Sequence, residues 1–237
     1  MASARRFYLA PDQFAADDAL CEGDAANRLV GVLRLRAGDA VHVFDGCGHE
    51  RAARVAEVTP RRVKLALLHA IAPLAEPPVP VTLACAFPRG SRGDWIVEKA
   101  TELGVSRIVP VAAGRAVLAP GGGRIERWRR IAIEAAEQCG RAVVPEIGGD
   151  APRDARMLVA DPRATTTMRA ALAGSPAPAV AVFVGPEGGW SDGELEALIA
   201  RGGTAVSLGP RTLRVETAAI VAVATVIDAT GGADGAS

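Results

Sequence analysis

The chain after residue 80 alternates between strand-like and helix-like segments, and this alternation limits the fold more than any other feature of the sequence. Buried-strand patterns occupy residues 81–87, 107–111, 157–161, 179–185 and 204–209. Helical patterns lie between or after them, over 94–103, over 124–139, from Ser191 onward and over 215–229. Strands that alternate with helices are typical of a parallel sheet covered by helices. We therefore predict an α/β domain over residues 81–230.

Two of these helices carry clear local signals. Residues 124–139 place apolar side chains on one stripe, as an amphipathic helix requires: Trp128, Ile131, Ala132, Ala135 and Cys139. Ser191 is followed three residues later by Glu194, which is the spacing of a capping box. The closing segment is apolar nearly all round. It is therefore expected to be buried on most sides, either in the core of the monomer or at a dimer interface.

A proline-rich connector, PLAEPPVP at residues 73–80, separates this region from a different first segment. Proline fixes φ and lacks an N–H donor, so the connector is the best candidate for a domain boundary. Before it, VHVF (41–44) and the alternating Val63–Leu67 stretch are predicted strands, and residues 24–35 are predicted to form one helix. The expected domains are residues 1–74, a linker at 75–80, residues 81–230, and a disordered tail at 231–237.

Composition excludes several classes of function. The 237 residues carry no formal net charge, so the whole molecule cannot steer itself onto a polyanion. The four cysteines and three histidines are scattered without the spacing of metal ligands, and no metal site is predicted. The N-terminus lacks the apolar core of a signal peptide, and the longest apolar run, 218–227, is about half of a membrane span. A reduced, cytoplasmic protein is expected.

Three predicted strands end in glycine- and proline-containing tips: LVADPR (158–163), VGPEGGW (184–190) and LGPRTLR (208–214). Open α/β sheets bind ligands at the carboxyl ends of their strands, and glycine permits close approach of the backbone. The tips are therefore predicted to converge on a small molecule. Any one of them alone could be an ordinary strand-to-helix turn. The third is more distinctive, because Arg211 and Arg214 flank Thr212-Leu213 within it and Glu216 and Thr217 follow at a helix start.

Familiar nucleotide and nucleophile motifs are missing from the sequence. No GxGxxG opens a strand–helix unit, no GxxxxGK[ST] phosphate loop occurs, and no serine sits in a GxSxG elbow. GCGHER (46–51) has two of three glycines, but it lies in the strand-rich first segment and is expected to be a hairpin turn. The predicted ligand is therefore not held like a dinucleotide or a nucleoside triphosphate.

With these residues in view, the chain resembles the ribosomal RNA small-subunit methyltransferase E family of the SPOUT methyltransferases. The stretches that carry the resemblance are FPRGSRGDWIVEKATELGVSRIVPV (87–111), ERWRRIAIEAAEQCGRAVVPEI (126–147), VGPEGGWSDGELEAL (184–198) and LGPRTLRVETAA (208–219). RRFYL (5–9) and VLRLRAGDAVHVFDG (32–46) extend it into the first segment. GPEGG alone is weak evidence, whereas GPEGG joined to LGPRTLRVETA at this spacing is specific.

The resemblance implies a fold and an activity. Residues 1–74 would form a PUA-like β-barrel that binds RNA, and residues 81–230 would form a SPOUT-type parallel-sheet domain with a trefoil knot. The protein would use S-adenosylmethionine to methylate N3 of a uridine in 16S rRNA, either as naked RNA or in the assembled small subunit. It would act as a homodimer, with the active site near the subunit interface.

The resemblance also places the cofactor against the three tips. The implied cofactor-binding residues are Leu158, Ala160, Val184, Gly185, Pro186, Glu187, Gly188, Gly189, Leu208, Gly209, Leu213 and Thr217.

Uridine N3 is a poor nucleophile until it loses its proton, so the site must accept that proton or stabilise the anion. Arg214 is predicted to stabilise the negative charge that spreads onto the uracil oxygens. Glu216 is the candidate base. The alternative for Glu216 is a favourable carboxylate at a helix N-terminus, and Glu187 either contacts the cofactor or stabilises its loop.

RNA binding must come from local clusters of arginine, because the total charge is zero. Each cluster alone could be a solvated face. Phosphate contacts would make RNA affinity fall as salt rises. The candidates are Arg5, Arg6, Arg34, Arg36, Arg61, Arg62, Arg89 and Arg92, with Lys64 beside Arg61 and Arg62.

The sequence departs from the family pattern at three places. Asn27-Arg28 stands where relatives often carry paired histidines, Gly31 where a basic residue is common, and Arg89 where a lysine is frequent. The first two concern the details of RNA docking.

Two other functions stay open. Knotted enzymes that methylate ribose 2′-hydroxyls usually show an SLNVS-like stretch where this chain has TLRVETA, and a non-catalytic ribosome-assembly factor would keep the fold without the chemistry.

Overall fold

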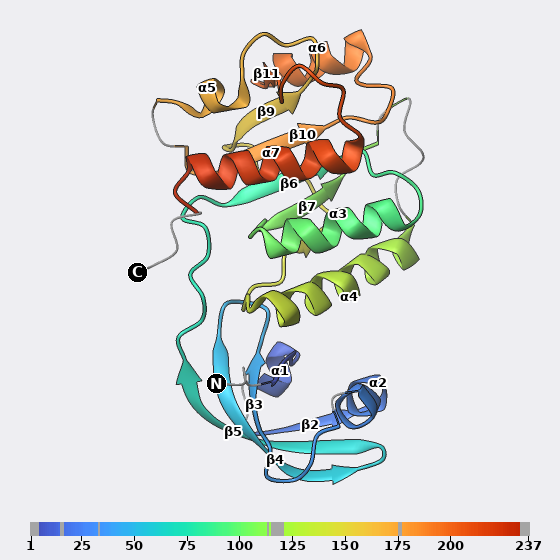
Figure 1. Ribbon diagram of the computed structural model, residues 1–237, viewed down its shortest axis with the longest axis vertical. Helices are drawn as coiled ribbons and strands as arrows, with labels where there is room; N and C mark the ends of the chain where they lie inside the picture. The colour runs from blue at the N-terminus through green and yellow to red at the C-terminus, as the bar shows by residue number, and fades with distance from the viewer. Residues whose placement is uncertain are drawn as a thin grey trace. The chain divides into compact units, whose positions relative to one another are not determined.

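The protein divides into two compact units (Figure 1). The computed structural model describes residues 5–14, 17–32, 34–112, 114, 121–174 and 177–232, without the side chains of residues 24, 25, 28 and 32. The first unit comprises the chain up to Leu74 together with Ala136–Val144, and the second comprises Ala75–Ala135 and the chain from Pro145. No helix formed by the described residues is long and apolar enough to cross a membrane. Most of the predicted tail, residues 233–237, lies outside the described residues.

The first unit is built on one mixed sheet of five strands in the order β1-β3-β4-β5-β2. Its strands are β1 (Arg5–Tyr8), β2 (Asp18–Glu22), β3 (Ala40–Phe44), β4 (Glu50–Thr59) and β5 (Arg62–Ile71). Only the β1–β3 pair is parallel. The predicted strands at 41–44 and 63–67 are confirmed. Two register shifts interrupt the β4–β5 ladder, and such irregularities bend a sheet around its core.

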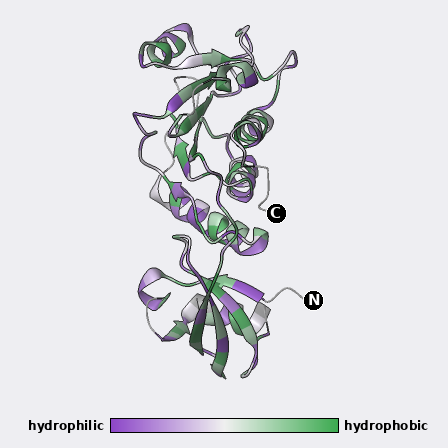
Figure 2. Ribbon diagram, turned by 90° about the vertical axis from the view of Figure 1, so that its left-hand side faces the viewer, coloured by the Kyte–Doolittle hydropathy of each residue, from purple (hydrophilic) through white to green (hydrophobic). Residues whose placement is uncertain are grey.

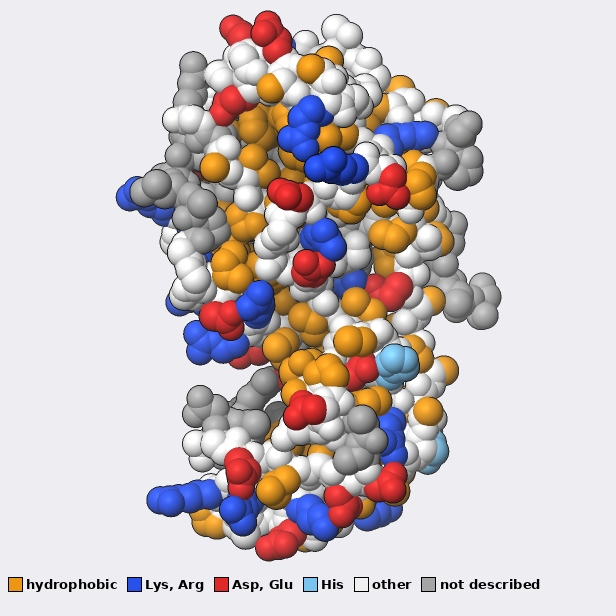
Figure 3. All heavy atoms as spheres, turned by 180° about the vertical axis from the view of Figure 1, so that it is seen from behind, with side chains coloured by type: hydrophobic (Ala, Val, Ile, Leu, Met, Phe, Trp, Pro, Cys, Tyr) orange, Lys and Arg blue, Asp and Glu red, His pale blue; other side chains and the backbone are white. Residues whose placement is uncertain are grey.

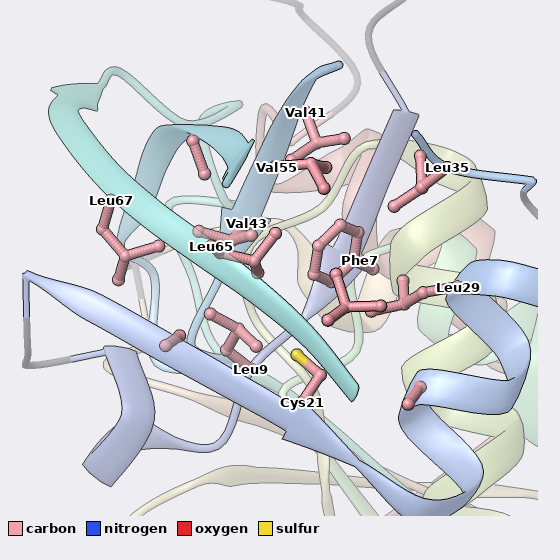
Figure 4. Packing of buried hydrophobic residues seen from close by; sticks show 14 residues of the cluster. Phe7, Leu9, Cys21, Leu29, Leu35, Val41, Val43, Val55, Leu65 and Leu67 are labelled. Carbon is pink, nitrogen blue, oxygen red and sulfur yellow. The ribbon is translucent and has the colours of Figure 1, made fainter. Parts of the chain in front are cut away.

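Alternate side chains of these strands meet in one apolar core, which Figure 4 shows from close by. Phe7, Val41, Val43, Val55 and Leu65 are almost completely buried there. Their intervening neighbours point to the opposite face of the sheet, where Arg54 and Lys64 are exposed and Phe44 is buried. The period-two pattern of the sequence therefore fixes which face of the sheet becomes the core.

The predicted single helix over 24–35 is realised differently. A short α-helix, α2 (Gly23–Asn27), continues as one π-helical segment, η1 (Arg28–Val32). Arg34 then has φ of 50°, and it is the one non-glycine residue in the described part of the chain with positive φ. Leu29 and Leu35 both reach the core. The wider π-helical turn and the change of backbone direction at Arg34 place these two side chains on the same side. A short helix, α1 (Pro11–Phe14), was not predicted.

Arg6 lies inside the first unit. Its guanidinium donates to both carboxylate oxygens of Glu50, at 2.9 and 2.8 Å, and to the carbonyl oxygens of Ala136 and Arg141. It also lies over the ring of Phe44, 4.4 Å from the centroid. The two partners are 11% and 6% exposed, so this is a buried ion pair with most of its donors used.

The second unit contains an all-parallel sheet of six strands in the order β11-β9-β10-β6-β7-β8. The strands are β6 (Val81–Cys85), β7 (Arg107–Pro110), β8 (Glu146–Ile147), β9 (Arg156–Ala160), β10 (Val180–Val184) and β11 (Thr204–Val206). The predicted α/β class is confirmed. The five predicted strands all appear, and the two-residue β8 is additional because it is too short to leave a pattern.

Helices cover both faces of this sheet, whose strands are predominantly hydrophobic in Figure 2. They are α3 (Ser91–Glu102), α4 (Gly122–Cys139), α5 (Met168–Leu172), α6 (Asp192–Ala200) and α7 (Val215–Ala229). Leu195 and Leu198 of α6 pack with Ala181 and Phe183 of β10. Helix α7 contacts β6, β10, α3 and α5. Since side chains alternate along β10, α7 covers the face opposite to α6.

The sequence predicted the helices well where their local signals were strong. The capping box of α6 is present, with Ser191 and Glu194 each bonded to the other's backbone N–H. Helix α7 has the predicted bounds. It is buried along one side, which includes Ala219, Val223 and Val226, while Val221 on the other side is 38% exposed. The monomer core therefore accounts for one side of its apolar surface.

Trp128 of α4 anchors that helix in the second unit. It is fully buried, and its ring centroid lies 4.4 Å from that of Phe87. Its indole N–H donates to a carboxylate oxygen of Asp94 in α3 at 3.1 Å. One side chain thus supplies a large apolar contact and satisfies its single donor, which a buried tryptophan requires.

Replacing Trp128 with Ala is expected to lower the free energy of unfolding by about 3–5 kcal/mol, because it leaves a large cavity and removes the indole donor to Asp94, which keeps its pair with Arg127. Urea unfolding followed by circular dichroism measures the change. Trp95 of α3 is 41% exposed, and Trp95→Ala should cost about 1 kcal/mol or less. Equal losses in the two variants would contradict the anchoring role of Trp128.

Candidate active site

The three predicted tips begin at the same level of the sheet. Ala160, the last residue of β9, pairs with Val184, the last residue of β10, and with Val206, the last residue of β11. The backbone N–H of Asp161 donates to the carbonyl of Val206 at 3.0 Å and extends this alignment by one residue. The loops that leave the three strands therefore start side by side.

These loops enclose a pocket of about 110 Å³. The three segments whose separation would have contradicted the prediction thus line one space. The first turns of α7 close it through Val215 and Ala218. The other lining residues are Ala160, Asp161, Pro162, Val184, Gly185, Pro186, Glu187, Gly189, Trp190, Leu208, Gly209, Arg211, Thr212 and Leu213.

Trp190 joins the first two tips. Its indole N–H donates to the carbonyl of Ala160 at 3.2 Å, and its ring lies directly against Gly185. A Cβ atom at Gly185 would lie 3.0–3.2 Å from three atoms of this ring, so only glycine fits without displacing it. Gly189 has φ of 70°, and its N–H donates to the carbonyl of Pro186 at 2.8 Å, which closes a tight turn. Two positions of GPEGG therefore require glycine for different reasons: Gly185 because of the close contact with Trp190, and Gly189 because of its positive φ.

Asp161 brings a buried negative charge to the pocket. It is 3% exposed, and it accepts hydrogen bonds from the backbone N–H and the guanidinium of Arg163, at 2.7 and 2.8 Å. The hydrogen bonds from the Arg163 side chain lower the pKa of the Asp161 carboxyl, against the opposing effect of burial. Arg163 also bonds the exposed Asp192 at 2.7 Å. The carboxylate is thus held ionised and oriented beside the pocket.

Most of the predicted cofactor residues lie on the pocket wall. Leu158 is completely buried within β9, two residues before the end of the strand, and Thr217 is exposed in the first turn of α7. Neither they nor Gly188 are among the lining residues. The predicted residues that do line the pocket are Ala160, Val184, Gly185, Pro186, Glu187, Gly189, Leu208, Gly209 and Leu213.

The two predicted catalytic residues lie at the start of α7. Arg214 occupies the N-cap position and is exposed, and it is not among the lining residues, whereas the neighbouring Arg211 is. The side chain of Glu216 is 15% exposed, and Arg92 lies 3.8 Å from one of its oxygens. Glu216 also lies in the acidic first turn of the helix, as the alternative reading of this residue expects.

The predicted RNA-binding arginines fall into two groups. Arg6 has its donors engaged inside the first unit, and Arg92 pairs with Glu187 and Glu216. Arg92 is itself 44% exposed, and the other six are also exposed, although Arg62 pairs with Glu22 at 2.7 Å and Arg5 lies 3.9 Å from Asp39. Figure 3 shows basic and acidic side chains interspersed over the visible face, in keeping with the zero net charge. Exposure alone does not select among these arginines.

A family model described as an RNA methyltransferase domain matches residues 75–227, and one described as an RNA methyltransferase PUA domain matches residues 22–68. A ribosomal RNA small subunit methyltransferase E from Synechocystis is 35% identical over 233 residues, which cover 93% of this chain and 76% of that protein.

The chain belongs to the ribosomal RNA small subunit methyltransferase E family.

Solved structures agree with this family assignment. The enzyme of the same name from Neisseria gonorrhoeae, bound to S-adenosyl methionine, has a TM-score of 0.83 and 32% identity, covering 93% of this chain and 95% of that one. A Legionella pneumophila protein in complex with the bound cofactor SAM has a TM-score of 0.86 and 29% identity, with 96% and 98% covered. The PUA-like and SPOUT-type folds implied by the resemblance are therefore confirmed.

Several residues that line the pocket of this chain were not assigned from the sequence. Asp161 and Pro162 directly follow β9, and Trp190 directly follows GPEGG. These residues lie inside the predicted tips, and a rule that takes every polar or aromatic residue of a tip finds Asp161 and Trp190 but not Pro162. Arg211 and Thr212 were noted in the third tip but not assigned to the site. No local signal separates them from Arg214, because the direction of each side chain depends on how the loop meets α7.

Asp161→Asn is expected to weaken binding of S-adenosylmethionine about tenfold, because the pocket loses its anionic acceptor and Arg163 loses its buried partner. Isothermal titration calorimetry measures the affinity. Asp192→Asn removes the exposed partner of the same arginine and should change the affinity less than twofold.

The lowered pKa also sets a pH dependence. The stability that the Asp161–Arg163 pair contributes should be fully present above about pH 4 and lost as pH falls through the lowered pKa of the folded state. In Asp161→Asn, this loss of stability at acid pH should no longer occur. Thermal unfolding at a series of pH values measures the difference. An unchanged affinity in Asp161→Asn would contradict the assigned role.

Proposed function

We propose that this chain transfers a methyl group from S-adenosylmethionine to N3 of a uridine in the 16S rRNA of the small ribosomal subunit. The observation that carries the proposal is the single pocket enclosed by the three tips, in a chain that belongs to this family. Two similar structures hold S-adenosylmethionine, which supports the same cofactor here. We place the reaction in the cytoplasm, where ribosomal RNA is processed in bacteria.

The pocket fits this cofactor chemically. S-adenosylmethionine supplies an electrophilic methyl group on a sulfonium, and its adenine, ribose and ammonium groups need donors, acceptors and close backbone. The turn closed by Gly189 presents backbone groups without a side chain. Gly185 likewise has no side chain, so the backbone of the pocket wall can come close to a ligand. Asp161 and Glu187 supply negative charge for hydroxyl or ammonium donors. We propose that the cofactor is held by the residues predicted from the sequence that line this pocket, together with Asp161 and Trp190.

Residues of this chain would then prepare the nucleophile. We propose that Arg214 stabilises the uracil anion and that Glu216 accepts the N3 proton. Arg211 is a second candidate for the role of Arg214, because it lies on the pocket wall. Guanidinium groups suit the role because they remain charged and can direct two donors at one carbonyl oxygen.

The remaining parts of the proposal concern partners. Arg5, Arg34, Arg36, Arg61, Arg62 and Arg89 are retained as RNA-binding candidates, and Arg6 is not, since its guanidinium stabilises the first unit. Val221 on the exposed side of α7 supports a homodimer through that helix. The trefoil knot and the assembled small subunit as substrate stay predictions, as do residues 1–74, 75–80, 81–230 and 231–237 as the domain, linker and tail boundaries.

Mass mapping of methylated nucleosides tests the reaction directly. Ribosomal RNA from a strain lacking the gene should contain no 3-methyluridine at the target position, and the purified chain with S-adenosylmethionine should restore it. Appearance of a 2′-O-methylated nucleoside instead would favour the ribose reaction. A chain that binds no S-adenosylmethionine would favour the non-catalytic assembly factor.

Arg214→Ala should lower kcat about 100-fold with less than a threefold change in the affinity for S-adenosylmethionine, because it removes stabilisation needed only in the transition state. Arg211→Ala should be measured beside it. A larger loss of kcat in Arg211→Ala would move the role to Arg211. Equal losses of turnover and cofactor affinity in Arg214→Ala would mean that Arg214 holds the cofactor instead.

A further inference from the structure

Arg92 joins two carboxylates of the pocket region. It lies in the first turn of α3, and its Nη1 atom is 3.3 Å from Oε1 of Glu187 and 3.8 Å from Oε2 of Glu216. Glu187 belongs to the GPEGG tip and lines the pocket, whereas Glu216 belongs to the first turn of α7. One guanidinium therefore connects two elements that are far apart in the sequence.

The side chains of Arg92 and Glu187 are 44% and 55% exposed, whereas that of Glu216 is 15% exposed, so the demand for a cation comes mainly from Glu216. Oε2 of Glu216 is buried and has no hydrogen-bond partner among the described residues. An uncompensated buried carboxylate oxygen is costly, and two carboxylates near one another repel. The neighbouring thiol of Cys85 supplies no charge, since burial and then the charges of Glu187 and Glu216 raise its pKa. Arg92 is the charge that offsets both carboxylates.

The geometry points to Arg92 as a positioning residue that clamps the GPEGG tip to the start of α7. This inference rests on the proposed function for the reaction, but the clamp itself acts on the cofactor pocket. With Arg92 in place, the wall carrying Glu187 and the helix carrying Glu216 and Ala218 keep their separation. The guanidinium, 3.8 Å from Oε2, also keeps a positive charge beside the carboxylate of Glu216, which is the proposed proton acceptor.

A different role for Arg92 is contact with an RNA phosphate, which was the expectation from sequence. A phosphate would have to replace the ion pairs with Glu187 and Glu216, leaving the buried oxygen of Glu216 uncompensated. The clamp and the phosphate contact therefore predict different kinetics. Loss of a clamp lowers cofactor affinity and kcat, whereas loss of a phosphate contact raises KM for RNA.

Arg92→Ala tests the clamp. Calorimetry should show a three- to tenfold weaker affinity for S-adenosylmethionine, and transfer of labelled methyl groups to rRNA should show a kcat about 30- to 100-fold lower. Arg92→Lys keeps the charge and should recover part of both quantities. In a Glu187→Gln background, Arg92→Ala should weaken cofactor affinity less than it does in the wild type, because the two residues act together.

Two arginines serve as matched controls. Arg129→Ala removes an exposed arginine of α4 that pairs with Glu126 one turn away, and should leave affinity and kcat unchanged. Arg89→Ala removes an exposed arginine three residues before Arg92, and should raise KM for RNA without changing cofactor affinity. If Arg92→Ala raises KM for RNA and leaves cofactor affinity unchanged, as expected for Arg89→Ala, the clamp is overturned in favour of a phosphate contact. If Arg92→Ala changes neither cofactor affinity nor the kinetics, the clamp is also overturned.

The readouts separate this inference from the proposed function. Labelled methyl transfer counts every product, so the clamp is decided whichever atom of the RNA is methylated. Should mass mapping show a product other than 3-methyluridine, the proposed position is wrong while the Arg92 variants still report on the clamp. If the wild-type chain transfers no methyl group, the calorimetric affinities of Arg92→Ala and its controls still support or overturn it.

Discussion

The functional site depends on the parallel, in-register pairing of β9, β10 and β11. Ala160 pairs with the last residues of both neighbours, so three loops leave the sheet at one level. Parallel strands with a common end place their carboxyl-terminal loops at the same edge, which is where open α/β sheets bind ligands. A shift of one residue in either ladder would displace a loop along the strand direction by about 3.3 Å. The pocket could not keep its shape after such a shift.

Short-range contacts then join the loops into one wall. Trp190 bonds Ala160 and packs on Gly185, so the second tip is fastened to the first. Asp161 is fixed by Arg163, and Arg92 lies between Glu187 and Glu216. Each of these contacts pairs a charge or donor with a partner, as groups removed from water require. The loops are thus joined to one another by residues of the site itself.

The first unit shows how the same residue type can serve different purposes. Arg5 and Arg6 are adjacent in sequence, yet the side chain of Arg5 is 49% exposed and that of Arg6 is 11% exposed. Alternation along β1 sends one arginine to solvent and the other to Glu50 and the carbonyls of Ala136 and Arg141. A cluster of arginines in a sequence therefore indicates candidates for RNA contact, and only packing separates the structural members from the others.

The amino-acid sequence by itself determined most strands and helices of the second unit and the three tips, because hydrophobic periodicity, helix capping and glycine conformation act over a few residues. The bounds of α7 and the capping box of α6 were correct for that reason. Resemblance to a family, rather than any pattern rule, supplied the PUA-like and SPOUT-type architecture. Tertiary structure alone decided that Asp161, Trp190 and Arg211 line the pocket while Leu158 and Thr217 do not. It also broke the predicted helix at 24–35, because Leu29 and Leu35 must both reach one core. Side-chain direction depends on contacts between segments distant in the chain, and those contacts leave no local signal.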